Sequence, residues 1–165
     1  METSKRNHLE VRDNNGEYRP ATEGEILAAA EKVINSKFRR GARISGPQAS
    51  KALFQQKLAL REDEVFAVLF LDGRHRVIEY TEMFHGSINC ASVHPRVIVK
   101  RALNLNAAAV VVAHNHPSGD IEPSSQDRNV TRMVKEALTL IEVRLLDHII
   151  IGSTDTFSFS EQGDL

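Results

Sequence analysis

The sequence is poor in the residues that cross-link or anchor small domains. It has one cysteine, Cys90, and no tryptophan among its 165 residues. A single cysteine excludes an intramolecular disulfide and a cysteine-rich zinc site, and it is typical of a protein from the reducing cytoplasm. No apolar run approaches the roughly 20 residues of a membrane-spanning helix. Residues 1–19 are polar and do not have the pattern of a signal peptide. We therefore expect a cytoplasmic protein with no membrane partner.

The chain also lacks a strong charge of either sign. Its 21 lysines and arginines are offset by 22 aspartates and glutamates, for a net charge of −1. No global field would therefore attract nucleic acid or a membrane surface. A local basic cluster (Lys37, Arg39, Arg40 and Arg43) could contact a phosphate backbone. We favour the simpler interpretation that it complements a helix dipole, so DNA association is only weakly indicated and the oligomeric state is not predicted.

What the chain does contain is enough apolar sequence for one globular core, since 41% of its residues are hydrophobic. We expect three parts. Residues 1–20 have few apolar side chains and predict a flexible arm. Residues 21–60 show apolar residues at helical spacing and predict a helical preface. Residues 61–165 hold the longest apolar runs and predict the main domain.

Continuous apolar runs in the main domain are typical of strands that are covered on both faces. The predicted order is a hairpin (64–71 and 77–84), a helix from Pro95, a strand (107–113), a helix from Ser124, a strand (143–151), and a short strand holding Phe157 and Phe159. Together with the two preceding helices, this order favours a three-layer α/β fold. Its sheet is mixed, with helices on both faces.

One stretch carries most of the chemistry. It leaves the 107–113 strand as His114-Asn115-His116-Pro117 and enters the next helix near Asp127. Two histidines one residue apart on a strand point to the same side, because strand side chains alternate. Two imidazoles and a carboxylate form a three-ligand zinc site with a position open for water, which is the catalytic kind. We therefore predict that His114, His116 and Asp127 bind Zn²⁺.

The same residues resemble the JAMM motif of the JAB/MPN metalloprotease superfamily. That motif is an upstream glutamate, then His-x-His-Pro, six residues, Ser, two residues and Asp. Here His-Asn-His-Pro ends at Pro117, and six residues separate it from Ser124, which precedes Asp127 at the same offset. The wording His-Asn-His-Pro-Ser-Gly-Asp, with Asp-His-Ile-Ile at 147–150, is similar to the RadC-like branch. The resemblance covers residues 45 to 160, roughly.

This resemblance implies a fold and an activity for residues 61–165. It implies a JAB/MPN-like, cytidine-deaminase-like domain that acts as a metal-dependent hydrolase with Zn²⁺ as its cofactor. The implied substrate is a protein or peptide, cut at an amide or isopeptide bond by zinc-activated water. A link to DNA repair or to mobile elements is implied by the RadC-like branch.

The family's upstream glutamate takes a proton from the water and passes it to the leaving amine. We assign this role to Glu64, because it opens the first core strand, where the family keeps its glutamate. Glu62, Glu79 and Glu82 are rivals that the sequence leaves open.

Three further residues have two interpretations each. Ser124 could donate a hydrogen bond to the oxyanion of the intermediate, or it could be only the N-cap of the next helix. His148 could orient a metal ligand, or it could be a hydrogen-bonded core histidine. The role of Asp147 is open in the same way.

Two other classes of function stay open beside the metallopeptidase. Superfamily members that lose their ligands become scaffolds, so a non-catalytic interaction module in DNA repair or recombination is one alternative. This chain keeps all three ligands, which favours activity. A metal-dependent nuclease using the same site is the other alternative. Longer RadC-like proteins carry a helix-hairpin-helix module for DNA, and the residues before 60 lack its Gly-rich hairpin.

Overall fold

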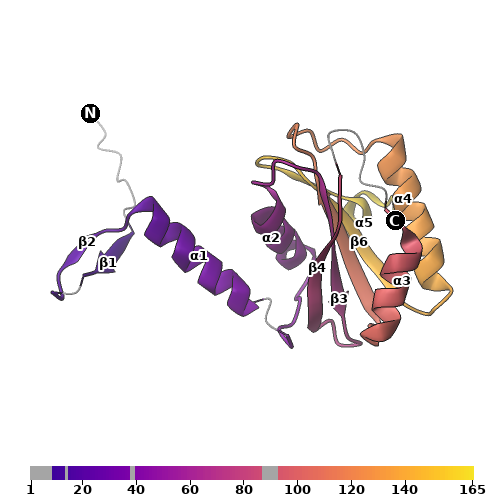
Figure 1. Cartoon of the computed structure of the whole chain (residues 1–165), viewed down its shortest axis with the longest axis horizontal. Coiled ribbons are helices and arrows are strands. Elements are labelled where there is room, and N and C mark those ends of the chain that lie inside the picture. Colours follow the sequence, from indigo (N-terminus) through magenta and orange to yellow (C-terminus); the bar gives the residue numbers. More distant parts are fainter. Residues whose placement is uncertain (1–8, 14, 38–39, 87–92) are drawn as a thin grey trace. The chain divides into compact units, whose positions relative to one another are not determined.

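The fold was analysed in a computed structural model (Figure 1). It describes residues 9–13, 15–37, 40–86 and 93–165. Contacts divide the chain into two units, Met1–Lys37 and Phe38–Leu165. The boundaries that we predicted at residues 20 and 60 stay predictions, and the contacts group the helix before residue 60 with the sheet.

The first unit holds a hairpin and a helix. Strands β1 (Glu10–Arg12) and β2 (Tyr18–Pro20) pair antiparallel. Helix α1 (Glu23–Lys37) begins with a reciprocal cap: the Thr22 N–H donates to Glu25 Oε2 at 2.9 Å, and the Glu25 N–H donates to Thr22 Oγ1 at 3.3 Å. This pair satisfies two N–H groups that a helix start leaves without partners. The predicted arm thus contains a two-stranded hairpin.

In the second unit, the described residues form a five-stranded sheet in the order β4-β3-β5-β6-β7. Its strands are β3 (Val65–Leu71), β4 (Val77–His85), β5 (Ala109–Asn115), β6 (Arg144–Ile151) and β7 (Thr156–Ser158). β5 and β6 pair parallel, and the other neighbours pair antiparallel. The sheet is therefore mixed, as predicted.

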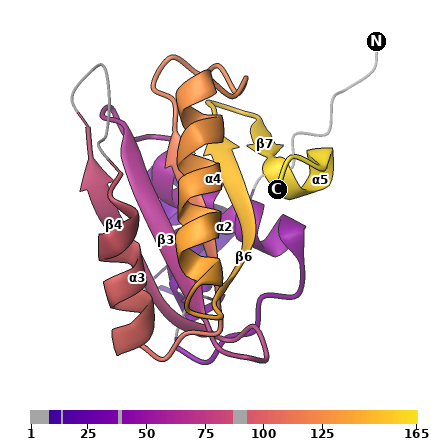
Figure 2. The same cartoon turned by 90° about the vertical axis from the view of Figure 1, so that its right-hand side faces the viewer.

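Helices cover both faces of this sheet (Figures 1 and 2), which confirms the predicted fold class. Helix α2 (Pro47–Leu58) packs on one face, and α3 (Pro95–Asn104) and α4 (Ser125–Thr139) pack on the other. All seven residues of β3 are buried, because alternate side chains enter the two cores. No helix in the described part of the chain is long and apolar enough to cross a membrane.

The C-terminal strand is shorter than we predicted. β7 ends at Ser158, and Phe159 begins the short helix α5 (Phe159–Gln162). The Ser158 side chain accepts a hydrogen bond from the Glu161 N–H at 3.2 Å, so Ser158 is the N-cap of that helix. The alternation of phenylalanine and serine predicted a strand through Phe159, and this local cap overrides it.

Phe54→Ala tests whether α2 belongs to the core. Phe54 is fully buried between α2 and the sheet, with its ring centroid 5.9 Å from that of Tyr80. We expect the substitution to lower the free energy of unfolding by about 3–5 kcal/mol, because it leaves a cavity. Leu60→Ala is the control: Leu60 is 90% exposed, and its effect should be below about 0.5 kcal/mol. Urea denaturation measures both. Equal, small effects would show that α2 is a separable preface.

Candidate metal centre

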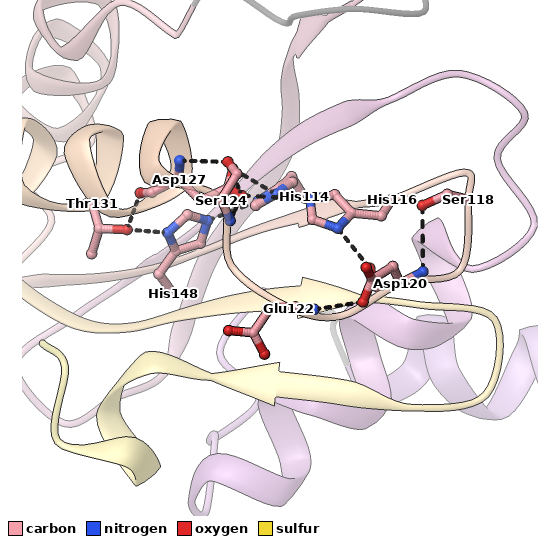
Figure 3. A network of polar contacts seen from close by, with 9 residues as sticks. All are labelled: His114, His116, Ser118, Asp120, Glu122, Ser124, Asp127, Thr131 and His148. Atoms are coloured by element: carbon pink, nitrogen blue, oxygen red, sulfur yellow. Dashed lines mark hydrogen bonds and ion pairs between the residues drawn. The ribbon is translucent and has the colours of Figure 1, made fainter.

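The three predicted ligands meet at the end of β5 (Figure 3). His114 lies in β5, on the face covered by α3 and α4, and its side chain is buried. His116 follows the strand, and its backbone N–H donates to the carbonyl of Ile151 in β6 at 2.9 Å. Asp127 lies in the first turn of α4. One ligand atom from each residue lies within 4.8 Å of the other two, so the three could hold a metal ion.

Asp127 is positioned by the start of its own helix. Its Oδ2 accepts hydrogen bonds from the Ser124 N–H at 2.8 Å and the Ser124 hydroxyl at 2.6 Å. Ser124 Oγ in turn accepts from the Asp127 N–H at 3.1 Å, which completes a capping box. The other oxygen, Oδ1, lies 3.1 Å from His114 Nε2. The spacing Ser-x-x-Asp therefore both caps α4 and aims a carboxylate at the histidines.

Ser124 is thus the N-cap of α4. Its hydroxyl proton is directed to Asp127 in this structure. The role of Ser124 as an oxyanion donor stays a prediction.

The loop between β5 and α4 fixes the ring of His116. Its Nδ1 lies 2.6 Å from the carbonyl oxygen of Asp120. A carbonyl can only accept, so Nδ1 carries a proton and Nε2 faces the site. The loop turns at Gly119, where φ is +82°, and it packs tightly on the turn after β6. A Cβ added at Gly152 would lie 2.6 Å from the Gly119 carbonyl oxygen, so this packing requires glycine at 152.

The donor atoms crowd together. His114 Nε2 and His116 Nε2 lie 2.9 Å apart, and Asp127 Oδ2 is 3.6 Å from His116 Nε2. Burial would raise the pKa of Asp127, but its hydrogen bonds to His114, His116 and Ser124 outweigh burial and hold the pKa well below its usual range. The hydrogen bond to Asp127 also raises the pKa of His116, against the effect of burial. Converging lone pairs need a proton or a cation between them, and two imidazoles with one carboxylate fit zinc.

His148 contacts the ring nitrogen of His114 that faces away from His116 (Figure 3). Its Nε2 is 2.9 Å from His114 Nδ1, and its Nδ1 is 2.6 Å from Thr131 Oγ1. The ring is fully buried and stacks on Phe159, with Phe66 at its edge. Burial lowers the pKa of His148 well below its ordinary value. The sequence left this residue open and gave no sign of Thr131 except its place one helical turn after Asp127.

Asp147 faces away from the metal centre. It accepts hydrogen bonds from the Ser158 hydroxyl at 2.6 Å and from the Ser160 N–H at 3.0 Å. These contacts tie β6 to the cap of α5. In the described residues, Asp147 thus holds the C-terminal segment in place.

A cavity of about 420 Å³ adjoins His116. It is lined by Glu62, Asp63, Glu64, His116, Pro117 and Ser118. Glu64 lies immediately before β3. Its charge also raises the pKa of His116, although by less than the contacts of His116 with Asp127 and Asp120.

The rival glutamates are in different surroundings. Glu79 is paired with Arg101, and Glu82 is paired with Arg61 at 2.8 Å. Glu62 lines the cavity together with Glu64. The assignment of the general base to Glu64 stays a prediction.

Asn115, between the two histidines, was missed by the sequence analysis. It is buried and faces the opposite side of the sheet. Its Oδ1 accepts from the Val65 N–H at 2.8 Å, and its Nδ2 donates to the carbonyl oxygen of Asp63 at 3.0 Å. These bonds fasten the segment that carries Glu64 to the end of β5. Motif spacing could not reveal them, because the partners lie about 50 positions earlier.

Comparison with known proteins is consistent with this geometry. A family model described as the RadC-like JAB domain matches residues 44–164. The chain belongs to this family. UPF0758 proteins from Xylella fastidiosa strain 9a5c and Coxiella burnetii are 53% and 52% identical to it, over 83% and 84% of the chain. The matches cover 61% and 63% of those relatives. A UPF0758 protein from Vibrio cholerae is 46% identical over 87% of the chain and 90% of its own length.

Asn115→Ala should loosen the segment before β3. It leaves the Val65 N–H and the Asp63 carbonyl without their partner, which we expect to lower the free energy of unfolding by about 2–3 kcal/mol. Amide hydrogen exchange at Val65 should become faster. Asn129→Ala is the control, because Asn129 is exposed on α4 and bonds Arg132. If Val65 keeps wild-type protection in Asn115→Ala, the proposed fastening is wrong.

Proposed function

We propose that this chain is a zinc-dependent hydrolase, a metallopeptidase that cuts an amide or isopeptide bond in a protein or peptide. The observation that carries this proposal is the convergence of His114, His116 and Asp127 beside a cavity that Glu64 lines. Membership of the RadC-like JAB domain family supports it. The chain spans about 61% of the length of the Xylella relatives. The activity is therefore proposed for this chain and is not taken from those longer proteins.

A bound zinc ion would supply a water whose pKa is lowered to about 7. The chain's own residues would do the remaining work. Glu64 would accept a proton from the water and return it to the leaving amine. Asp127 is held in place by Ser124, and the Ser124 hydroxyl would have to turn its proton away from Asp127 Oδ2 to donate to an oxyanion.

The setting of this activity is proposed on family grounds. We place the hydrolase in the reducing cytoplasm, in DNA repair or in the biology of mobile elements. A protein or peptide would be its partner in the cavity lined by Pro117 and Ser118. Direct DNA association is a weaker proposal, because the basic cluster around Arg40 and Arg43 is small.

Metal content tests the centre itself. Wild-type protein purified without a chelating tag should hold about one zinc per chain, and His116→Ala should lose it, since three protein ligands are needed. His85→Ala is the matched control, because His85 is exposed at the end of β4, and it should keep the metal. Elemental analysis gives the stoichiometry. A wild-type chain that takes up no zinc on reconstitution would sink the proposal.

Glu64→Gln tests the general base. The zinc-loaded variant should keep its metal and lose turnover by about 10²–10⁴-fold, because the amide cannot accept the proton. Glu62→Gln alters the same cavity and should change turnover only a few-fold. Full turnover in Glu64→Gln would show that another group is the base.

The substrates used in this assay separate the classes of function. Peptide, isopeptide-linked and nucleic-acid substrates are compared with the zinc-loaded wild type. Cleavage of nucleic acid alone would favour the nuclease. Binding to a protein without any turnover would favour the interaction module.

A further inference from the structure

Two of the three metal-centre residues are joined behind the site by a closed chain of contacts (Figure 3). His114 Nδ1 contacts His148 Nε2 at 2.9 Å, and His148 Nδ1 contacts Thr131 Oγ1 at 2.6 Å. Thr131 Oγ1 then contacts the backbone carbonyl of Asp127 at 2.6 Å. The carboxylate of the same Asp127 faces His114 Nε2 at 3.1 Å. His114 and Asp127 are therefore connected through His148 and Thr131, which do not line the cavity.

The direction of each hydrogen bond follows from one contact. Two oxygens at 2.6 Å need a proton between them, and the Asp127 carbonyl has none, so the Thr131 hydroxyl donates to it. The hydroxyl has no second proton, so it must accept from His148 Nδ1. The His148 ring is neutral, since it is fully buried between two phenylalanines. Its Nε2 therefore accepts from His114 Nδ1.

The consequence falls on the metal-facing nitrogen. With its proton held on Nδ1, His114 presents Nε2 to the site, and this atom faces His116 and Asp127. We propose that Thr131 and His148 are a positioning pair that fixes the His114 ring through its Nδ1–H, with Nε2 directed at the site. The role of the pair in metal binding rests on the proposed zinc site, whereas the hydrogen bond from His114 Nδ1 to His148 does not.

The Nδ1 proton of His114 can be observed in the metal-free chain. Long-range ¹H–¹⁵N NMR should show a proton on His114 Nδ1 that exchanges slowly with water, because Nδ1 donates to the buried His148. In Thr131→Val, His148 loses its acceptor, and this proton should exchange faster. Thr131→Ser keeps the hydroxyl and should restore the wild-type pattern. A wild-type His114 with no proton on Nδ1 would overturn the inference.

Zinc affinity, measured by competition with a chelator, gives the second readout. Thr131→Val should bind zinc about 10–100-fold more weakly than the wild type, the usual effect of losing a partner behind a ligand. Thr139→Val is the matched control: Thr139 makes the same back-bond to the Lys135 carbonyl, at 2.8 Å, on the exposed side of α4. Thr139→Val and Thr131→Ser should bind as the wild type does.

The outcomes separate this inference from the proposed function. Equal affinity of Thr131→Val and Thr139→Val would overturn the positioning pair and leave the zinc site standing. A wild-type chain that binds no zinc would overturn the proposed function, and the Nδ1 proton of His114 in the metal-free chain would still decide the inference.

Discussion

The hydrogen bonds between Ser124 and Asp127 fix where α4 begins, and the geometry of the metal centre depends on that start. Successive residues of a helix are turned by about 100° around its axis. A start displaced by one residue would therefore turn the Asp127 carboxylate away from His114, and it would turn Thr131 away from His148. Two of these bonds, donated by the N–H groups of Ser124 and Asp127, also satisfy donors that the helix start would otherwise leave without partners. One local interaction thus stabilises the helix and aligns two separate contacts with the histidines.

The alternation of side chains along the central strands gives neighbouring residues opposite tasks. His114 faces the metal centre, whereas Asn115 reaches the other side and holds the segment of Glu64. On β6, His148 faces His114, whereas Asp147 reaches the other side and holds the cap of α5. The parallel pairing of β5 with β6 places the two histidines on one face. Each strand therefore supplies one residue to the centre or its surroundings on one face and a neighbouring residue that fastens a distant segment on the other.

The strands, the main helices and the clustering of His114, His116 and Asp127 could be predicted because their signals are local. Apolar runs mark β3, β5 and β6, and His114 to Asp127 is one short stretch. Contacts between distant segments could not be predicted, because spacing carries no information about them: Asn115 with Val65, and His148 with Thr131, are examples. The predicted end of β7 was wrong for a different reason. The alternation of phenylalanine and serine predicts a strand through Phe159, but Ser158 caps a helix that begins there. The choice between Glu62 and Glu64 depends on where each carboxylate points in the cavity, and a sequence does not encode that directly.

The donor atoms of the candidate metal centre converge closely, which favours a cation between them. Two imidazole nitrogens 2.9 Å apart, with a carboxylate oxygen beside them, repel one another unless something positive lies between. The carboxylate is partly buried, which is costly, and Ser124 offsets part of that cost by donating to it. His114 is held from behind by a neutral histidine rather than by a second carboxylate. Asp127 is thus the one carboxylate among the three residues of the centre, and Glu64 in the adjoining cavity adds its charge to the attraction for a cation. Because the three residues come from β5, the following loop and α4, any ion bound there would also tie these elements together.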